Sequence, residues 1–159
     1  MNYTSMDSPV GPLTIAGNAN GLHSISFGAQ CPARAPTPYG RDPGCDVIEE
    51  TVRQLRAYFA RKLVQFDLPL KPEGTPFQMQ VWRELQDIPY GVLISYGELA
   101  RRIGKPKASR AVGAANGANP IPIIIPCHRV IGSNGKITGY AGGVHIKEAL
   151  LELERVRLV

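Results

Sequence analysis

The stretch that decides the fold of the C-terminal half is residues 95–115, which reads SYGELARRIGKPKASRAVGAA. Ser95 and Glu98 stand three residues apart ahead of an apolar stripe, the spacing of a helix capping box. Gly104-Lys-Pro106 predicts a short turn, and a second helix is expected over residues 107–115. Two helices joined by a short glycine-containing turn predict a helix-turn-helix.

The second of these helices differs from a helix that reads DNA bases in the major groove. Base edges there are read by long side chains such as Arg, Gln and Asn. This helix offers mostly Ala, Gly and Ser, with Arg110 as its one long side chain beyond Lys107. A helix this slim fits the narrower minor groove, and a single arginine can fill the gap that a flipped nucleotide leaves. Tight helix–helix packing through small residues, with Arg110 solvated, is the alternative.

Capping signals predict two further helices in the same half. Thr75, Pro76 and Gln78 fit the N-cap, N1 and N3 positions of one helix. Residues 144–155 predict the last one. The expected inward-facing residues of the two helices are Phe77, Val81, Leu85 and Ile88, then Ile146, Leu150 and Leu153. With the helix-turn-helix between them, residues 71–159 predict a mostly helical domain.

Residues 1–70 predict a separate α/β domain. Alternation of apolar and polar residues begins at Leu13, residues 18–21 suit a turn, and residues 22–27 alternate again. This pattern predicts a β-hairpin. Residues 28–45 are rich in proline and glycine and predict a loop.

A helix is expected after this loop, because Asp46 and Glu49 have the spacing of a capping box. Its expected apolar face consists of Ile48, Val52, Leu55 and Phe59. Residues 63–70 favour another strand, and residues 71–75 have the composition of a linker. We therefore predict one domain over residues 1–70 and a second over residues 71–159.

Length and composition exclude several classes of protein. A chain of 159 residues, 43% apolar and 19% charged, suits one ordinary domain or two small ones and is too apolar for a disordered tail. The first ten residues contain no Lys or Arg, and the longest apolar run is interrupted by proline. We therefore expect neither a secretory leader nor a membrane span. Three cysteines, an odd number, disfavour a disulfide scaffold. We expect a soluble, intracellular protein.

The net charge of +5 is unevenly distributed along the chain. Residues 1–70 hold six basic and six acidic side chains, whereas residues 71–159 hold twelve basic and seven acidic ones. Residues 99–147 contain eight Lys or Arg and no Asp or Glu. A segment of one sign beside a neutral domain indicates an anionic partner, with nucleic acid the first candidate. A solvated basic face is the alternative.

The sharpest local feature is IPIIIPCHRV at residues 121–130. A cysteine directly after a buried apolar run is most often an inert core residue. His128 and Arg129 follow Cys127 inside the acid-free basic segment, however, which favours the thiolate. Neighbouring side chains of an extended segment point to opposite faces, so His128 can serve Cys127 as a base only across a bend or through a water. Its ring also needs a carboxylate partner. The candidates, which spacing cannot rank, are Glu148, Glu152 and Glu154.

These motifs resemble those of the O6-alkylguanine-DNA alkyltransferase family, the methylated-DNA–protein-cysteine methyltransferases. The match covers nearly the whole C-terminal half in register, and PCHRV at residues 126–130 is its most specific block. The other matching blocks are Phe77-Gln-x-Gln-Val-Trp82, Ile88-Pro-Tyr-Gly91, Ser95-Tyr-Gly97, Ser109-Arg-Ala-Val-Gly113, Asn119-Pro120, Gly139-Tyr-Ala-Gly-Gly143, Lys147 and Glu154. The N-terminal half matches only in size and in its β-then-helix character.

The resemblance implies an N-terminal ribonuclease-H-like α/β domain and a C-terminal winged-helix-like domain with a helix-turn-helix. It implies binding of double-stranded DNA through the minor groove and rotation of an O6-alkylguanine out of the helix. The alkyl group, chiefly methyl, is then transferred irreversibly to the protein's own cysteine, with O4-methylthymine as a second expected substrate. Such single-turnover transfer needs no cofactor, because the alkylated base is already an electrophile. We expect a monomer in the cytoplasm, or in the nucleus of a eukaryote.

Carried over by position, the resemblance implies four catalytic residues. Cys127 is the nucleophile and alkyl acceptor, His128 acts through a water, and Glu154 orients His128. Asn119 links the hydrogen bonds of the recognition helix to those of the active-site segment.

The resemblance also implies substrate and DNA contacts. Tyr96 helps to rotate the nucleotide and donates a proton to the departing guanine, and Arg110 fills the vacated stack. The residues expected around the base and the DNA backbone are Val130, Tyr140, Ala141 and Ser133.

The sequence departs from the family at some positions. Ala141 stands where the human-type enzyme has serine, so only its backbone N–H is left for the base. Cys31, Cys45 and His23 do not reproduce the N-terminal zinc site of some relatives, so we predict no metal, and pairing of the two cysteines stays open. The chain lacks the Cys-rich module of adaptive-response regulators, which argues against a transcription-activator role.

Two other functions are weighed against the enzyme. A protein that flags lesions without transfer would carry another residue, often Trp, in place of Cys127. A plain helix-turn-helix regulator would need base-reading side chains on the second helix and a dimer interface, and the sequence indicates neither. The sequence therefore favours the enzyme.

Overall fold

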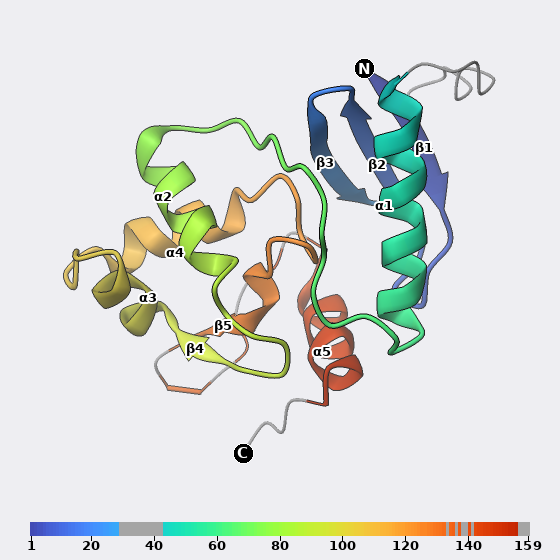
Figure 1. Ribbon diagram of the computed structural model, residues 1–159. Helices are drawn as coiled ribbons and strands as arrows, with labels where there is room; N and C mark the ends of the chain where they lie inside the picture. Colours follow the sequence, from blue (N-terminus) through green and yellow to red (C-terminus); the bar gives the residue numbers. More distant parts are fainter. Residues whose placement is uncertain (29–42, 133, 136, 138–139, 141, 156–159) are drawn as a thin grey trace. The chain divides into compact units, whose positions relative to one another are not determined.

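The computed structural model describes residues 1–28, 43–132, 134–135, 137, 140 and 142–155, with the backbone alone for residues 43–45. The chain divides into two compact units, Met1–Glu73 and Gly74–Val159 (Figure 1). The first combines a sheet with a helix and the second is mostly helical, so the predicted combination of an α/β and a mostly α domain is confirmed.

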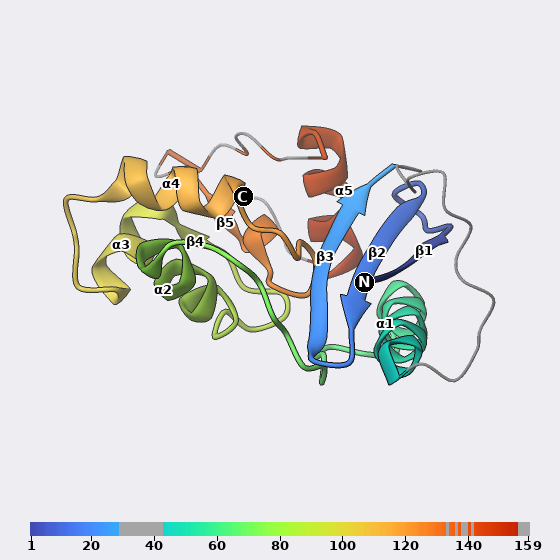
Figure 2. The same ribbon diagram turned by 90° about the horizontal axis from the view of Figure 1, so that it is seen from above.

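The first unit is an antiparallel sheet with one helix on its face (Figures 1 and 2). Its elements are β1 (Asn2–Met6), β2 (Leu13–Asn18), β3 (Gly21–Phe27) and α1 (Pro43–Phe59), with strand order β1-β2-β3. The predicted hairpin is β2–β3, with Leu13 opposite Phe27 and Asn18 opposite Gly21. Strand β1 was not predicted, because its five residues (NYTSM) carry no clear alternation.

Helix α1 begins at Pro43, so the prediction of Asp46 as its N-cap is wrong. Proline lacks a backbone N–H and suits the first turn of a helix, where that donor has no partner. The predicted apolar face is only partly right: Ile48 and Leu55 are buried, but Val52 and Phe59 are half-buried. The remaining buried residues of α1 are Thr51, Gln54 and Tyr58.

Residues 63–70, which favoured a strand, form a single bridge in which Leu70 lies parallel to Leu22. Prolines at 69 and 72 remove the donors that a longer ladder would need. The segment is fixed instead by Leu22, whose N–H donates to Pro69 (2.7 Å) and whose carbonyl accepts from Lys71 (2.8 Å). A Cβ on Gly21, which has a positive φ of 147°, would lie 2.5 Å from the Pro69 carbonyl oxygen, so this close approach requires glycine.

The second unit contains four α-helices among its described residues, together with a short parallel ladder. Its elements are α2 (Pro76–Leu85), β4 (Ile94–Ser95), α3 (Tyr96–Arg102), α4 (Ser109–Gly117), the 3-10 helix η1 (Cys127–Arg129), β5 (Val130–Ile131) and α5 (Val144–Leu153). The capping box of α2 is confirmed, because Thr75 accepts from the Gln78 N–H and Gln78 accepts from the Thr75 N–H. Of the inward stripe predicted for α2, Phe77 is only half-buried.

The predicted helix-turn-helix is present as α3 and α4 (Figure 1). Ser95 caps α3 as expected, but the Glu98 carboxylate does not complete the box: it binds Arg101 and Arg102 on the next turn. Helix α4 lies two residues further along than residues 107–115. It packs against α2 and α3, and its buried residues are Val112, Ala115 and Asn116.

Helix α5 ends at Leu153, two residues before the predicted end, because Arg155 takes a left-handed φ of 57°. Ile146 and Leu150 are buried as predicted, whereas Leu153 is half-buried. Lys147 and Leu151 join the buried face. No helix in the part of the chain that the structure describes is long and apolar enough to cross a membrane.

Candidate active site

The segment that carries Cys127 is buried from residue 121 to residue 130. The extended conformation on which the sequence argument rested is wrong: turns span residues 122–124, and residues 127–129 form the 3-10 helix η1. The prolines at 122 and 126 break the strand pattern there. Ile123 has a φ of 74°, which is strained for a β-branched residue. The bend that would let neighbouring side chains converge is therefore built into the backbone.

Asn119 holds this bent segment in place. It is buried, its Oδ1 accepts from the Ile121 N–H (2.9 Å), and its Nδ2 donates to the Ile125 carbonyl (2.8 Å). The Asn116 amide donates to the Cys127 carbonyl (3.3 Å). Both asparagines lie at the C-terminal end of α4 or just beyond it, so the helix is connected to the cysteine by hydrogen bonds.

The Cys127 thiol is 4% exposed, and its burial raises its pKa. Hydrogen bonds from the side chains of Asn119 and Tyr140 and the positive charge of Lys147 act in the opposite direction without outweighing burial. The expectation that its basic neighbours favour the thiolate is therefore wrong for the resting protein. The physical reason is burial, which disfavours the charged thiolate more than Lys147 and the two hydrogen bonds favour it.

Arg129 and His128 both bind one buried carboxylate, that of Glu154. His128 Nε2 lies 2.6 Å from Glu154 Oε2, and Arg129 approaches both carboxylate oxygens, with Nε 2.8 Å from Oε1 and Nη2 3.1 Å from Oε2. Arg129 Nη1 also donates to the Ile88 carbonyl at 2.6 Å. Of the three acidic residues that spacing left open, Glu154 is thus the one that contacts His128.

The ionisation of this cluster follows from its burial. Burial alone would raise the pKa of Glu154, but its hydrogen bonds and ion pairs with His128 and Arg129 hold that pKa well below its usual range. Burial lowers the pKa of His128 despite the attraction of Glu154. His128 Nδ1 is buried, and no residue that the structure describes forms a hydrogen bond with it. A neutral ring that donates from Nε2 to Glu154 presents Nδ1 as a proton acceptor.

Tyr96 connects the helix-turn-helix to this cluster. It begins α3 directly after β4, and β4 pairs in parallel with β5, so Ile94 lies opposite Val130, three residues after Cys127. A Cβ on Gly113 of α4 would lie 3.9 Å from the Tyr96 ring. Val130 itself is fully buried.

The remaining predicted site residues fall into two groups. Arg110 is exposed on α4, as a DNA-contacting side chain would be. Ser133 and Ala141 lie outside the described residues, as do Cys31 and the side chain of Cys45. Within the described ranges there is no cluster of three His, Cys, Asp or Glu side chains able to hold a metal.

Sequence reasoning did not predict the ion pair of Arg129 with Glu154 or the complete burial of Lys147. Both carried a signal. Arg129 lies in a segment without any acidic residue, so a counter-ion had to come from elsewhere in the chain. Lys147 follows Ile146 and precedes Leu150, which places it on the inward side of α5.

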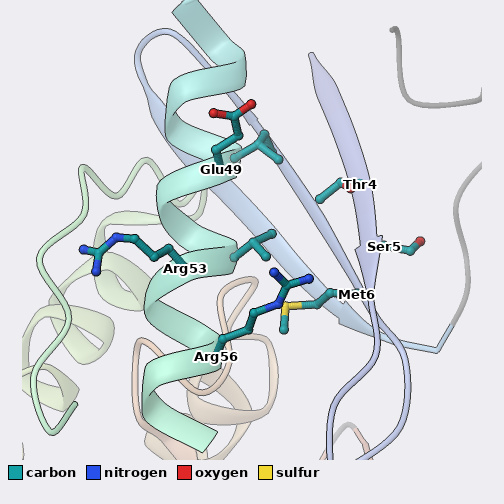
Figure 3. A pocket seen from close by; sticks show the side chains of 8 residues that line it. Thr4, Ser5, Met6, Glu49, Arg53 and Arg56 are labelled. Carbon is teal, nitrogen blue, oxygen red and sulfur yellow. The ribbon is translucent and has the colours of Figure 1, made fainter. Parts of the chain in front are cut away.

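A separate pocket of about 380 Å³ lies in the first unit, between β1 and α1 (Figure 3). Its lining consists of Thr4, Ser5, Met6, Ile48, Glu49, Val52, Arg53 and Arg56. This lining contains no cysteine or histidine, and hence no pairing of a thiol or imidazole nucleophile with a base. The second unit, which contains Cys127 and His128, is therefore the better candidate for the active site.

A buried thiol directly before the histidine of an imidazole–carboxylate pair, in a domain with a helix-turn-helix, is the arrangement expected of a cysteine-dependent enzyme on a DNA-binding fold. Two family models match the chain. Residues 76–156 match the DNA-binding domain of 6-O-methylguanine DNA methyltransferase, and residues 1–72 match its ribonuclease-like domain. The chain belongs to this methyltransferase family.

Individual relatives agree over nearly the whole length. The methylated-DNA–protein-cysteine methyltransferase of Methanosarcina acetivorans is 52% identical over 154 residues, covering 97% of this chain and 98% of the relative. That of Mycobacterium tuberculosis is 52% identical over 157 residues, covering 99% and 94%. A crystal structure of the Mycobacterium tuberculosis protein in complex with DNA superposes with a TM-score of 0.86, covering 98% and 93%. The predicted family, fold class and DNA-repair methyltransferase activity are therefore confirmed.

Proposed function

We propose that Cys127 is the acceptor in this reaction and takes the alkyl group of an O6-alkylguanine, chiefly O6-methylguanine, in duplex DNA. The observation that carries the proposal is the buried thiol, hydrogen-bonded by Asn119 and Tyr140, next to the His128–Glu154 pair. The sulfur forms a bond to the alkyl carbon while the bond from that carbon to O6 breaks and its electron pair stays with the guanine. The thioether product is stable, so each chain reacts once, and no cofactor is needed.

The proton of the thiol leaves during this reaction, because burial keeps the resting sulfur protonated. We propose that His128 Nδ1 accepts it through a water, as the free acceptor position of a neutral ring allows. Glu154 then stabilises the imidazolium that forms, and Arg129 keeps Glu154 ionised and oriented. Arg129 is thus a positioning residue that acts through Glu154.

The same proposal assigns the contacts with DNA. Tyr96 helps to rotate the nucleotide and donates a proton to the departing guanine. The phenolate that this leaves regains a proton from solvent, and the imidazolium of His128 releases the thiol proton to solvent, so that no net proton is gained or lost. Arg110, exposed on a helix of otherwise small side chains, enters the minor groove and fills the vacated stack. The residues proposed to surround the base and the DNA backbone are Val130, Tyr140, Ala141 and Ser133. The crystal structure of the Mycobacterium tuberculosis relative in complex with DNA supports DNA as the partner. O4-methylthymine is the proposed second substrate.

The proposed catalytic and DNA-contacting residues all lie in the second unit of one chain. We therefore propose that a monomer suffices, acting where the DNA is, in the cytoplasm or in a nucleus.

A single-turnover assay with a duplex oligonucleotide carrying one O6-methylguanine tests the proposal. We expect Cys127→Ala to bind the duplex with unchanged affinity and to transfer no methyl group. Cys31→Ala, the matched control, is expected to react at the wild-type rate. Methyl transfer by the Cys127→Ala variant would contradict the assignment.

A further inference from the structure

Lys147 is a cation buried inside the second unit. Its side chain is 0% exposed, and it lies on α5, which packs against the η1 segment that carries Cys127. Lysine is almost never fully buried unless its ammonium group is paired with another group, because removing an ammonium from water is costly. Burial lowers the pKa of Lys147, and electrostatic attraction to Cys127 raises it again in part.

The surroundings of Lys147 connect the thiol to the base-binding side. Its Nζ lies 5.9 Å from the centroid of the Tyr96 ring, close enough for a cation–π interaction. Its charge attracts a thiolate at Cys127 and disfavours a proton on His128. Lys147 therefore faces both the group that attacks and the ring proposed to handle the nucleotide.

The other ionisable groups around the thiol are engaged differently. Two of them lie on η1. Arg129 binds the Glu154 carboxylate and the Ile88 carbonyl, and burial lowers the pKa of His128. From the end of α5, Glu154 binds both of them. Tyr140, from the segment before α5, contributes a hydrogen bond and no charge. Among the described residues, the charged side chain that lowers the pKa of Cys127 is Lys147.

We propose that Lys147 is the electrostatic partner of Cys127, and that its buried ammonium stabilises the thiolate from the loss of its proton until the sulfur–methyl bond forms. Lys147 keeps its own proton throughout. The thiol proton goes to His128, the methyl carbon passes from O6 to sulfur, and guanine gains the proton that balances the reaction. This inference rests on the proposed role of Cys127 as acceptor.

The pH dependence of single-turnover methyl transfer from an O6-methylguanine duplex tests the inference. We expect Lys147→Met to move the rising limb of the profile to higher pH, with about a ten-fold slower rate at neutral pH for each unit of displacement. Its rate should approach that of the wild type at alkaline pH. Lys147→Arg keeps the charge and should keep the profile, and Lys62→Met, which removes an exposed lysine of the first unit, should not move it.

Two results of this assay would overturn the inference. One is a Lys147→Met profile that does not move, and the other is a rate reduced by the same factor at every pH, as a purely structural role would produce. If the wild type itself accepts no methyl group on Cys127, the proposed function fails instead, so the two failures are distinguishable.

A reciprocal measurement keeps the test decisive if Lys147→Met does not fold, which circular dichroism would reveal. The pKa of Lys147 is measured by NMR titration of its side chain in the wild type and in Cys127→Ala. Because coupling between two sites is reciprocal, removal of the thiol should lower the pKa of Lys147. An equal pKa in both proteins would contradict the pairing.

Discussion

The two units of the chain differ in whether charged side chains lie in their cores. Among the described residues of the first unit, the buried polar side chains are Thr4, Thr14, Thr51 and Gln54, all of them uncharged, and the ion pair of Arg53 with Glu50 lies at the surface. In the second unit, the described residues that are buried include His128, Arg129, Lys147 and Glu154. Among the described residues, the core of the first unit thus contains no charged side chain, whereas the core of the second unit contains ionisable groups.

Stability alone does not explain the buried ionisable groups of the second unit. Removing an ion from water costs several kcal/mol, and well-packed apolar residues often replace a buried ion pair without loss. A cluster of buried ionisable groups around a thiol is therefore expected where pKa values must be set for a reaction. The exposed pairs of Glu50 and Glu98, by contrast, contribute little to the folded state.

The largest effect is expected from a variant that breaks the buried cluster of His128, Arg129 and Glu154. Glu154→Gln leaves the Arg129 charge buried without its counter-ion, and should lower the free energy of unfolding by about 3–5 kcal/mol. The matched surface change, Glu50→Gln, should have little effect. Urea denaturation followed by circular dichroism measures both, and the fluorescence of Trp82, the single tryptophan, follows the second unit. Equal losses in the two variants would contradict the distinction between the units.

The second effect concerns exposed arginines. Nucleotide flipping costs a few kcal/mol, so Arg110→Ala should slow transfer from duplex DNA by roughly 10- to 100-fold. Reaction with a free O6-alkylguanine base, which needs no flipping, should be unchanged. Arg53→Ala, an exposed arginine of the first unit, is the control and should alter neither rate. A loss of equal size on both substrates would remove Arg110 from the flipping step.

The third effect is a pH dependence of stability. The folded-state pKa of Glu154 lies below its ordinary value of 4.5, so its ionisation stabilises the folded protein at and above that value. The contribution is lost progressively as the pH falls from about 4.5 towards the folded-state pKa. We expect the stability of the wild type to fall more steeply with acid than that of Glu154→Gln. Parallel acid curves from urea titrations at several pH values would argue against this account.

The smallest effect concerns helix starts in the second unit. Thr75→Ala removes the N-cap of the confirmed capping box and should cost about 1 kcal/mol. Ser95→Ala removes a single cap hydrogen bond and should cost no more than that. Thermal unfolding of the two variants ranks the caps. A larger loss for Ser95→Ala would show that the α3 start has a role beyond capping.

Local signals were enough for parts of the fold. The capping box at Thr75 and the alternation around Leu13 are carried by neighbouring residues, and both elements form as predicted. The start of α1 was wrong because two overlapping signals compete there, a proline at 43 and an acidic residue at 46. Two helix-start signals three residues apart cannot be ranked without knowing how the helix packs.

The resemblance supplied the positions of the candidate site residues. The contacts among these residues depend on the folded geometry, and the pattern of the sequence alone did not predict them. Spacing left the carboxylate partner of His128 open, and contact with Glu154 depends on how α5 ends beside η1. The same folding takes Arg129 away from Cys127. The thiolate expected from neighbours in sequence is replaced by a buried thiol, because burial, which the sequence neighbours do not reveal, raises the pKa of Cys127.

The most direct test of the account is intact-protein mass spectrometry after incubation with an excess of duplex carrying one O6-methylguanine, followed by peptide mapping. We expect a gain of one methyl group per chain, located on Cys127, with no further gain on longer incubation. An unchanged mass in a protein that still binds the duplex, or a methyl group on another residue, would contradict it.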